Sequence, residues 1–198
     1  MKLRFSPASP FARKCAIAGH VLGLSGKIEL LDNKGDPGDA VRARNPLGKI
    51  PLLITDDGNA IFDSVVISEY LDHLAGGGRI IPVEPKARFH ALTQQALADG
   101  IMDAAILIMY ESRFREPHEH SARWISMQEK KRDTGLDALE AQVPGDTIHV
   151  GTIAIAAVLG YLDFRFKGAW RESRPKLAGW FDAFSKKLPG FEATQPGD

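Results

Sequence analysis

A proline stands at the start of a short apolar run, and its position constrains the fold more than any other feature of the sequence. The run Pro51-Leu52-Leu53-Ile54 is typical of a short buried strand. Proline cannot donate a hydrogen bond to a neighbouring strand, so a strand begins with it only where the chain turns. A cis bond between Ile50 and Pro51 would supply that turn. It would also leave the main-chain groups of Ile50 facing outward, where they could pair with an extended peptide by strand addition.

Composition excludes several classes of protein. The 198 residues are 44% hydrophobic, which is enough apolar material for one large or two small domains. The 25 basic and 25 acidic side chains balance, so there is no reason to expect nucleic acid or an anionic membrane as a partner. One cysteine excludes an internal disulfide. With no signal-peptide core and no apolar span of ~20 residues, we expect a cytoplasmic protein without a membrane segment.

The first part of the chain alternates strand and helix patterns in the order β-α-β, a crossover, and then β-β-α. Asp56-Asp57-Gly58-Asn59 is a hairpin signal. Residues 33–48 are polar and glycine-rich, which predicts a short or irregular helix there. We expect strands at residues 3–5, 28–31, 51–54 and 60–62, and helices at residues 11–24 and 64–74.

Residues 76–85 are rich in glycine and proline, and only helical patterns follow them. The sequence therefore predicts an α/β domain over residues 1–76 and an all-α domain over residues 84–198. Residues 151–166 are almost wholly apolar and should form the centre of the helical core. The other helices are expected from residue 85 through 108, at 119–142 and at 173–188.

Ser9 precedes Pro10 at the point where the first strand passes to the first helix. Serine is a good N-cap, and proline suits the first helical position. A helix start also attracts anions through its free N–H groups. Ser9 is therefore either a cap alone or a cap whose hydroxyl also donates to a bound thiolate, since a hydroxyl can accept and donate together.

Taken together, these features resemble the glutathione S-transferase family over nearly the whole chain, and within it a bacterial, serine-type branch. The resemblance implies a thioredoxin-like, glutathione-binding first domain and an all-helical second domain that contributes the second-substrate pocket. The residues that carry it are Ser9-Pro10-Phe11-Ala12-Arg13-Lys14, Asn45-Pro46-Leu47-Gly48-Lys49-Ile50-Pro51, Asp63-Ser64 and Leu159-Gly160-Tyr161-Leu162-Asp163-Phe164-Arg165.

The resemblance also implies roles for single residues. The Ile50 main chain would pair with the cysteinyl part of glutathione, while Asp63 and Ser64 would hold its γ-glutamyl end. Lys49 stands where relatives often have glutamine, and it either meets the glycyl carboxylate or is a solvated loop lysine. The glutathione-binding residues implied are Ser9, Phe11, Lys49, Ile50, Asp63 and Ser64.

Ser9 would stabilise the glutathione thiolate, which would then attack a small hydrophobic electrophile. Lowering a thiol pKa by ~2 units requires ~2.7 kcal/mol. A hydrogen bond to a charged group supplies roughly 1.5–3 kcal/mol and a helix dipole roughly 0.3–2 kcal/mol, so no separate general base is required. Ser6 is the competing hydroxyl. We prefer Ser9 because it directly precedes the helix.

Several other residues have two interpretations each. Asp99 and Asp103 are one turn apart, and they either form a solvated acidic face or reach across a homodimer to the partner's glutathione. Tyr110, Arg113 and Phe114 either line the second-substrate pocket or are ordinary packing and surface residues. The histidines form no recognisable metal-ligand pattern, so no metal is expected.

The start of the central helix of the second domain departs from the family. Relatives usually have Ser or Thr followed three residues later by Asp, which is a capping box. Here His149 and Thr152 occupy those positions. We therefore expect the reciprocal hydrogen bonds of the box to be weakened, at a cost of roughly 0.5–2 kcal/mol.

Three functions are compatible with this sequence. The first is a dimeric glutathione transferase with Ser9 as the catalytic residue and glutathione as co-substrate. The second is a non-catalytic module of the same fold that binds a partner protein, although such a module would not need the Asp63-Ser64 clamp. The third is a glutathione-dependent isomerase of a dicarboxylic acid, for which Arg113 and Arg115 are available cations.

Overall fold

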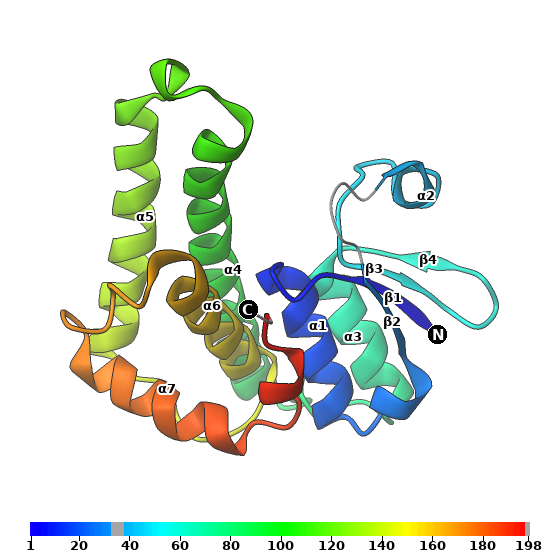
Figure 1. Ribbon diagram of the computed structural model, residues 1–198. Coiled ribbons are helices and arrows are strands. Elements are labelled where there is room, and N and C mark those ends of the chain that lie inside the picture. Colours follow the sequence, from blue (N-terminus) through cyan, green and yellow to red (C-terminus); the bar gives the residue numbers. More distant parts are fainter. Residues whose placement is uncertain (33–37, 197–198) are drawn as a thin grey trace.

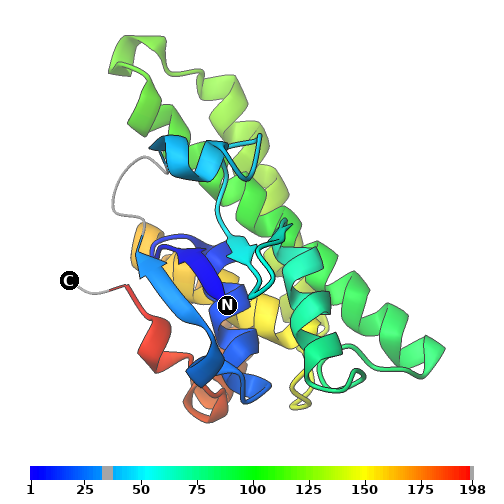
Figure 2. The ribbon, with the colours of Figure 1, turned by 90° about the vertical axis from the view of Figure 1, so that its right-hand side faces the viewer.

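Figure 1 shows the computed structural model, which describes residues 1–32 and 38–196. The N-terminal part holds a four-stranded mixed sheet with helices, and the C-terminal part is all-helical. The predicted fold class, a thioredoxin-like α/β domain followed by an all-α domain, is confirmed. Seen from the side of the sheet, the long helices of the C-terminal part pass behind it (Figure 2).

The sheet has the strand order β2-β1-β3-β4. β1 (Lys2–Phe5) runs parallel to β2 (Glu29–Asp32) and antiparallel to β3 (Leu52–Ile54), which pairs antiparallel with β4 (Ala60–Ile61). Leu3 and Leu53 face each other across β1 and β3 and are fully buried. They pack beneath α1 (Pro10–Val21) and α3 (Ser64–Leu74), which lie on the face of the sheet turned toward the helical part (Figure 1).

The turn before β3 follows the sequence prediction. The Ile50–Pro51 peptide bond is cis, and the strand itself begins one residue later, at Leu52. The predicted hairpin is present, because Gly58 N–H donates to the Thr55 carbonyl over 3.0 Å. The predicted irregular helix is α2 (Gly38–Arg42), while residues 33–37 of that stretch lie outside the described residues.

Four helices build the C-terminal part, as predicted: α4 (Pro85–Phe114), α5 (Ala122–Ala141), α6 (Val150–Phe166) and α7 (Pro175–Lys187). All residues from 150 to 159 are buried, which confirms α6 as the centre of the core. α4 and α5 form a long antiparallel hairpin beside it (Figure 1). Single turns of 3₁₀-helix connect longer elements at Ser25–Lys27 and Pro117–Glu119, and another, Glu192–Thr194, follows α7.

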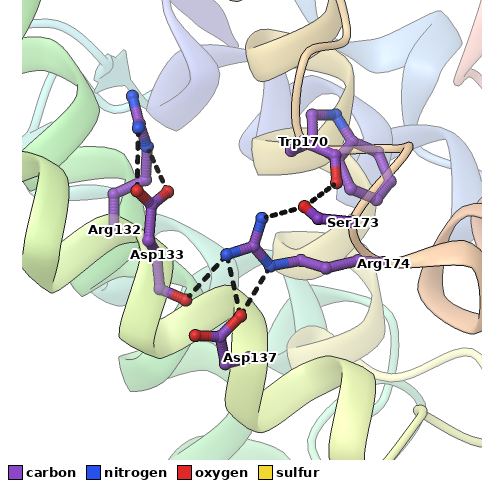
Figure 3. A network of polar contacts seen from close by, with 6 residues as sticks. All are labelled: Arg132, Asp133, Asp137, Trp170, Ser173 and Arg174. Carbon is purple, nitrogen blue, oxygen red and sulfur yellow. Dashed lines mark hydrogen bonds and ion pairs between the residues drawn. The ribbon is translucent and has the colours of Figure 1, made fainter.

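A guanidinium fastens the last long helix to α5. Arg174 precedes α7 and is only 8% exposed. Its Nε donates to the Asp137 carboxylate over 2.9 Å and its Nη2 to the Asp133 carbonyl over 3.3 Å (Figure 3). Its third nitrogen, Nη1, donates to the Ser173 hydroxyl. Because each nitrogen has an acceptor, this charge can be buried, and it holds α7 against α5.

The linker between the two parts is fixed by one carboxylate. Asp72, near the end of α3, is buried and accepts hydrogen bonds from the N–H groups of Gly78, Arg79 and Ile80 over 2.8–3.0 Å. The Ile80 carbonyl in turn accepts from the Val150 N–H at the start of α6. The glycine-rich linker is therefore tied to both parts. The exact domain limits at residues 76 and 84 remain a prediction.

The start of α6 corrects one expectation. Both hydrogen bonds of a capping box form, with an imidazole nitrogen in place of the usual hydroxyl. His149 Nδ1 accepts from the N–H groups of Gly151 and Thr152 over 3.2 and 3.3 Å, and Thr152 Oγ1 accepts from the His149 N–H over 3.0 Å. A neutral imidazole carries one acceptor nitrogen, so histidine caps this helix as long as that nitrogen is unprotonated.

This cap should make stability depend on pH. Burial lowers the pKa of His149, and the neighbouring His90 ring adds to the effect. Because the folded-state pKa lies below the unfolded value of about 6.5, the cap's stabilisation is complete above that pH. It is lost as the pH falls through the folded-state pKa. We expect His149→Asn, whose amide oxygen caps at any pH, to reduce the loss of unfolding free energy on acidification by about 0.5–2 kcal/mol.

The measurement is urea denaturation of both proteins at several pH values on either side of neutrality. His118→Asn, at an exposed histidine outside the core, serves as the matched control. Parallel pH profiles for wild type and His149→Asn would show that protonation of His149 does not disturb the cap.

Candidate functional site

Sheet topology brings three predicted segments to one edge. β1 and β4 both run antiparallel to β3, so the ends of β1 and β4 and the start of β3 lie at the same edge of the sheet. Ser9 follows β1, Asp63 follows β4, and Ile50 precedes β3. The candidate site is therefore a cluster of two helix starts and one loop. The directions of the strands bring these three segments together.

Ser9 caps α1 as predicted. Its backbone is extended, and its Oγ accepts from the Ala12 N–H over 3.3 Å. The Ser9 N–H donates to the Ser6 carbonyl over 2.9 Å, which closes the turn after β1. Accepting at the cap leaves the hydroxyl proton of Ser9 available for a further acceptor. The side chain is partly buried at the first turn of the helix, where the dipole favours negative charge.

Asp63 and Ser64 begin α3. The Asp63 carboxylate caps the helix by accepting from the Val65 N–H over 3.0 Å and is exposed. Ser64 is buried, and its carbonyl accepts from the Ser68 hydroxyl over 2.7 Å. The peptide bond between Phe62 and Asp63 is cis, a feature that could not be predicted because no proline follows Phe62. The predicted pair thus stands at a helix start with one charged and one buried polar side chain.

A short loop shaped by Asn45 presents the third segment. Asn45 is buried, and its amide Nδ2 donates to the Lys49 carbonyl over 2.8 Å while its Oδ1 accepts from the Leu47 N–H over 3.0 Å. Gly48 has φ of 63°, a conformation that glycine adopts without strain. The loop leaves Lys49 exposed and Ile50 half-buried against the core.

A buried ion pair joins the site to the helical part. Lys14, in the second turn of α1, has no exposed surface, and its Nζ lies 2.7 and 2.8 Å from the two carboxylate oxygens of Asp99 on α4. Burial raises the pKa of Asp99, although the charge of Lys14 acts against the shift. Asp99 is therefore bound within its own chain and is not part of a solvated acidic face.

Asp103 lies one turn further along α4 and is exposed. Burial raises its pKa, with Lys49 acting in the opposite sense and Asp63 in the same sense. Asp103 is therefore near enough to the loop and to the start of α3 for the charges of Lys49 and Asp63 to influence it. A contact of Asp99 or Asp103 with a second subunit remains a prediction.

The single cysteine is not part of the chemistry. Cys15 is fully buried, and its Sγ lies 3.6 Å from the Ser64 carbonyl. Burial raises the pKa of the Cys15 thiol to about 12, with the charge of Lys14 acting in the opposite sense. A thiol with this pKa stays protonated near neutral pH and is a poor nucleophile.

The three residues predicted for a second pocket lie together near the end of α4. Tyr110 and Phe114 form an edge-to-face pair with ring centroids 5.0 Å apart, and Arg113 lies 5.3 Å from the Phe114 ring centroid. All three are exposed. Tyr110 and Phe114 follow Asp99 and Asp103 at helical spacing, so they lie on the side of α4 that faces α1.

Sequence patterns did not identify the last turns of α6 as part of the region around the predicted second-substrate residues. Tyr161, Phe164 and Arg165 belong to a segment that the sequence linked to a bacterial family branch without giving it a role. Only the packing of α6 between α1 and α4 shows that these side chains could reach the same space.

The described residues form neither a metal-binding cluster nor a membrane-spanning helix. Within residues 1–32 and 38–196, no group of three or more histidine, cysteine or acidic side chains is placed to hold a metal ion. No described helix is both long and apolar enough to cross a membrane.

The Lys14–Asp99 pair gives a testable expectation. Asp99→Leu leaves the Lys14 ammonium buried without its partner, and we expect a loss of about 3–5 kcal/mol in unfolding free energy. Adding Lys14→Met should recover most of this loss, because the buried charge is then gone. Urea denaturation of the two single variants and the double variant measures the coupling.

Asp146→Asn, which removes an exposed ion pair with Lys187, is the control and should cost under about 1 kcal/mol. If the double variant is as unstable as Asp99→Leu alone, the pair does not carry the stability assigned to it.

Comparison with known proteins agrees with this geometry. Residues 8–74 match the family model for the glutathione S-transferase N-terminal domain, and residues 103–183 match that for the C-terminal domain. The chain is 36% identical over 204 residues to the uncharacterized GST-like protein YibF of Escherichia coli, covering 99% of this chain and 98% of that protein.

Solved structures give the same result. A glutathione transferase family member from Pseudomonas fluorescens, crystallised with bound glutathione, superposes with a TM-score of 0.92 at 37% identity over 100% of this chain and 99% of that one. A glutathione S-transferase from Methylobacillus flagellatus, also with glutathione bound, gives a TM-score of 0.90 at 32% identity over 99% of both chains. The protein therefore belongs to the glutathione S-transferase family.

Proposed function

We propose that this protein is a serine-type glutathione transferase in which Ser9 stabilises the thiolate of bound glutathione. The observation that carries the proposal is the meeting of two helix starts and one outward-facing loop at a single sheet edge. Each supplies a different kind of contact, and a γ-glutamyl tripeptide needs all three. The relative from Pseudomonas fluorescens binds glutathione, which supports the same ligand here.

Different residues would bind the main chain of glutathione and its charged ends. The Ile50 main chain would pair with the cysteinyl residue by strand addition. The Ser64 hydroxyl and the start of α3 would hold the γ-glutamyl α-carboxylate, while the Asp63 carboxylate, already exposed, would meet the ammonium group. Lys49, exposed on the loop, would meet the glycyl carboxylate, and Phe11 would pack beside the ligand at the first turn of α1.

The sulfur would lie at the start of α1. Ser9 already uses a lone pair for the cap, so its proton can be donated to the thiolate. A charged hydrogen bond and the helix dipole together supply enough free energy to lower the thiol pKa by about 2 units. The thiolate would attack an electrophilic carbon of a second substrate held by Tyr110, Arg113 and Phe114. No general base is needed.

The ligand bound to one relative bears on the chemistry of the electrophile. The protein from Pseudomonas fluorescens was also crystallised with S-(propanoic acid)-glutathione, at 37% identity over the whole of both chains and a TM-score of 0.88. That ligand carries a carboxylate a few bonds from the sulfur. We propose that this protein accepts conjugates of similar size, so the second substrate is small.

Replacing the serine tests the catalytic role. We expect Ser9→Ala to raise the pKa of the bound glutathione thiol by about 1–2 units and to slow conjugation of a generic aromatic halide below pH 7 roughly 10- to 100-fold. The pKa is measured from the ultraviolet absorbance of the thiolate in the binary complex, and the rate from steady-state kinetics across pH.

Ser6→Ala is the matched control, since it removes the competing hydroxyl directly after β1, and its rate should stay near wild type. An unchanged thiol pKa in Ser9→Ala would remove Ser9 from the mechanism. Retention of glutathione without any turnover by the wild type would instead favour the non-catalytic module.

We also propose that the protein is a homodimer that pairs through α3 and the start of α4. Val66 on α3 is 49% exposed and Phe89 on α4 is 67% exposed. The ion pair between Glu69 and Arg88, 3.2 Å long, links the two helices at that surface. An apolar face formed by two helices is a common site of subunit pairing. In such a dimer Asp103 is the carboxylate better placed to reach the partner's glutathione, because Asp99 is held by Lys14.

If the protein dimerises through this face, charged substitutions on the face should lower the mass of the protein in solution from dimer to monomer. The double variant Val66→Asp and Phe89→Asp should sediment as a monomer in analytical ultracentrifugation, because two carboxylates would have to be buried in the interface. Val83→Asp, at a linker residue that is 79% exposed, is the control and should stay dimeric. A wild type that sediments as a monomer would contradict the proposal.

A further inference from the structure

The last turn of α6 lies level with Ser9. The start of α6 and the end of α1 both contact the linker, since Val150 N–H donates to the Ile80 carbonyl and Arg79 donates to the Leu22 carbonyl. The two helices are therefore antiparallel, as Figure 1 shows. A Cβ at Gly160 would lie 2.4 Å from the Arg13 guanidinium. Ser9, one turn before Arg13, thus lies level with the residues one turn after Gly160.

Those residues are Phe164 and Arg165. Phe164 is one turn after Gly160, so it lies on the side of α6 that faces α1. Arg165 is one turn after Tyr161, on the neighbouring side toward α4. Phe164 is 42% exposed, although it is large and apolar. An exposed aromatic ring and an exposed guanidinium thus border the space between the helix starts of the candidate site and the end of α4.

Arg165 has no acidic partner in the described chain, unlike most of the arginines around it. Arg171 binds Asp163 and Asp182, Arg174 binds Asp137, and Arg115 lies 3.4 Å from Glu111. The acid nearest to Arg165 in sequence, Asp163, is used by Arg171 and the Trp170 indole. The Arg165 guanidinium instead stacks on Phe164, 4.4 Å from its ring centroid. Stacking of this kind holds an arginine in place while leaving its N–H groups free.

A phenol completes the arrangement. Tyr161 is 7% exposed, and its phenol lies close enough to Arg165 and to Tyr110 of α4 for both to influence its pKa. Burial raises the pKa of Tyr161 to about 12, although Arg165 acts in the opposite sense. The phenol therefore stays protonated near neutral pH and can donate. A guanidinium and a phenol side by side make a donor set that suits a carboxylate.

We propose that Arg165, with Tyr161, binds a carboxylate on the second substrate, so that the electrophiles of this protein are small carboxylic acids. The inference rests on the proposed glutathione transferase activity and names the substrate class of that site. It also accounts for a guanidinium that has no acidic partner among the described residues, since a pocket for a purely hydrophobic molecule would not need one.

The chemistry of such a substrate can be written for an α,β-unsaturated acid. The glutathione thiolate forms a C–S bond to the β-carbon, and the electron pair of the double bond moves to the α-carbon. A proton from solvent then completes the C–H bond there. In the transition state electron density spreads onto the carboxylate, where the Arg165 charge stabilises it.

A comparison of two glutathione conjugates isolates the contribution of the substrate carboxylate to binding. S-(2-carboxyethyl)glutathione and S-propylglutathione have chains of the same length, and only the first carries the acid. We expect the wild type to bind the carboxyethyl conjugate about tenfold more tightly, as one charged hydrogen-bonded pair at an exposed site should give. Isothermal titration calorimetry measures both dissociation constants.

Arg165→Gln should abolish this preference and leave the affinity for S-propylglutathione unchanged, while Arg165→Lys should keep part of it. Arg113→Gln tests the competing cation on α4. Arg123→Gln, at an exposed arginine on α5, is the matched control. Arg123→Gln should keep the wild-type preference, whereas loss of the preference in Arg113→Gln would assign the carboxylate to that cation instead.

The possible results separate a failure of this inference from a failure of the proposed glutathione transferase function. If the wild type binds neither conjugate nor glutathione, the proposed function fails and the inference fails with it. If both conjugates bind wild type equally, or if the preference survives Arg165→Gln or disappears in Arg113→Gln, the assignment to Arg165 is wrong while glutathione binding stands.

Discussion

Two adjacent cations on the first turns of α1 are both buried, and each finds its partner in the C-terminal part. Arg13 Nη2 donates to the Phe191 carbonyl over 2.8 Å, and its Nε donates to the Thr194 hydroxyl over 3.3 Å. Lys14 is held by both carboxylate oxygens of Asp99. Burying a charge is costly unless hydrogen bonds replace water, so α1 can pack in this way in one position only. Because Ser9 caps the same helix, the partners of these two cations also place the proposed thiolate-stabilising group against the helical part.

Local signals made much of the fold predictable. The proline at residue 51 indicated a turn with a cis bond, and the bond between Ile50 and Pro51 is cis. The helix predicted over residues 64–74 has those limits in the structure, because Asp63 is a strong N-cap and its signal lies next to the helix it starts. The unbroken apolar run of α6 likewise identified the centre of the core. In each case the residues that determine the structure are neighbours in the sequence.

The features that could not be predicted depend on residues far apart in the chain. Lys14 and Asp99 are 85 positions apart, and nothing in the pattern of α1 distinguishes a buried lysine from a solvated one. Arg165 was missed for the same reason, since only the structure shows that, among the described residues, it lacks the acidic partner that Arg171 and Arg174 have. The His149 cap was misjudged because the expected residue type was taken as necessary, whereas the helix requires only an acceptor atom in the right place.

The contacts of Arg13 also bear on the order in which the molecule can form during synthesis. Its partner Thr194 is 181 positions later in the sequence, so the ribosome finishes the whole sheet and most of the helices before that hydroxyl exists. Until then the guanidinium has no protein acceptor at that position and must remain hydrated. The nascent N-terminal part can form its strands early, but the start of α1 gains its final surroundings only when the Glu192–Thr194 turn closes over it. The site is thus among the last regions to mature, although its own residues are among the first to be made.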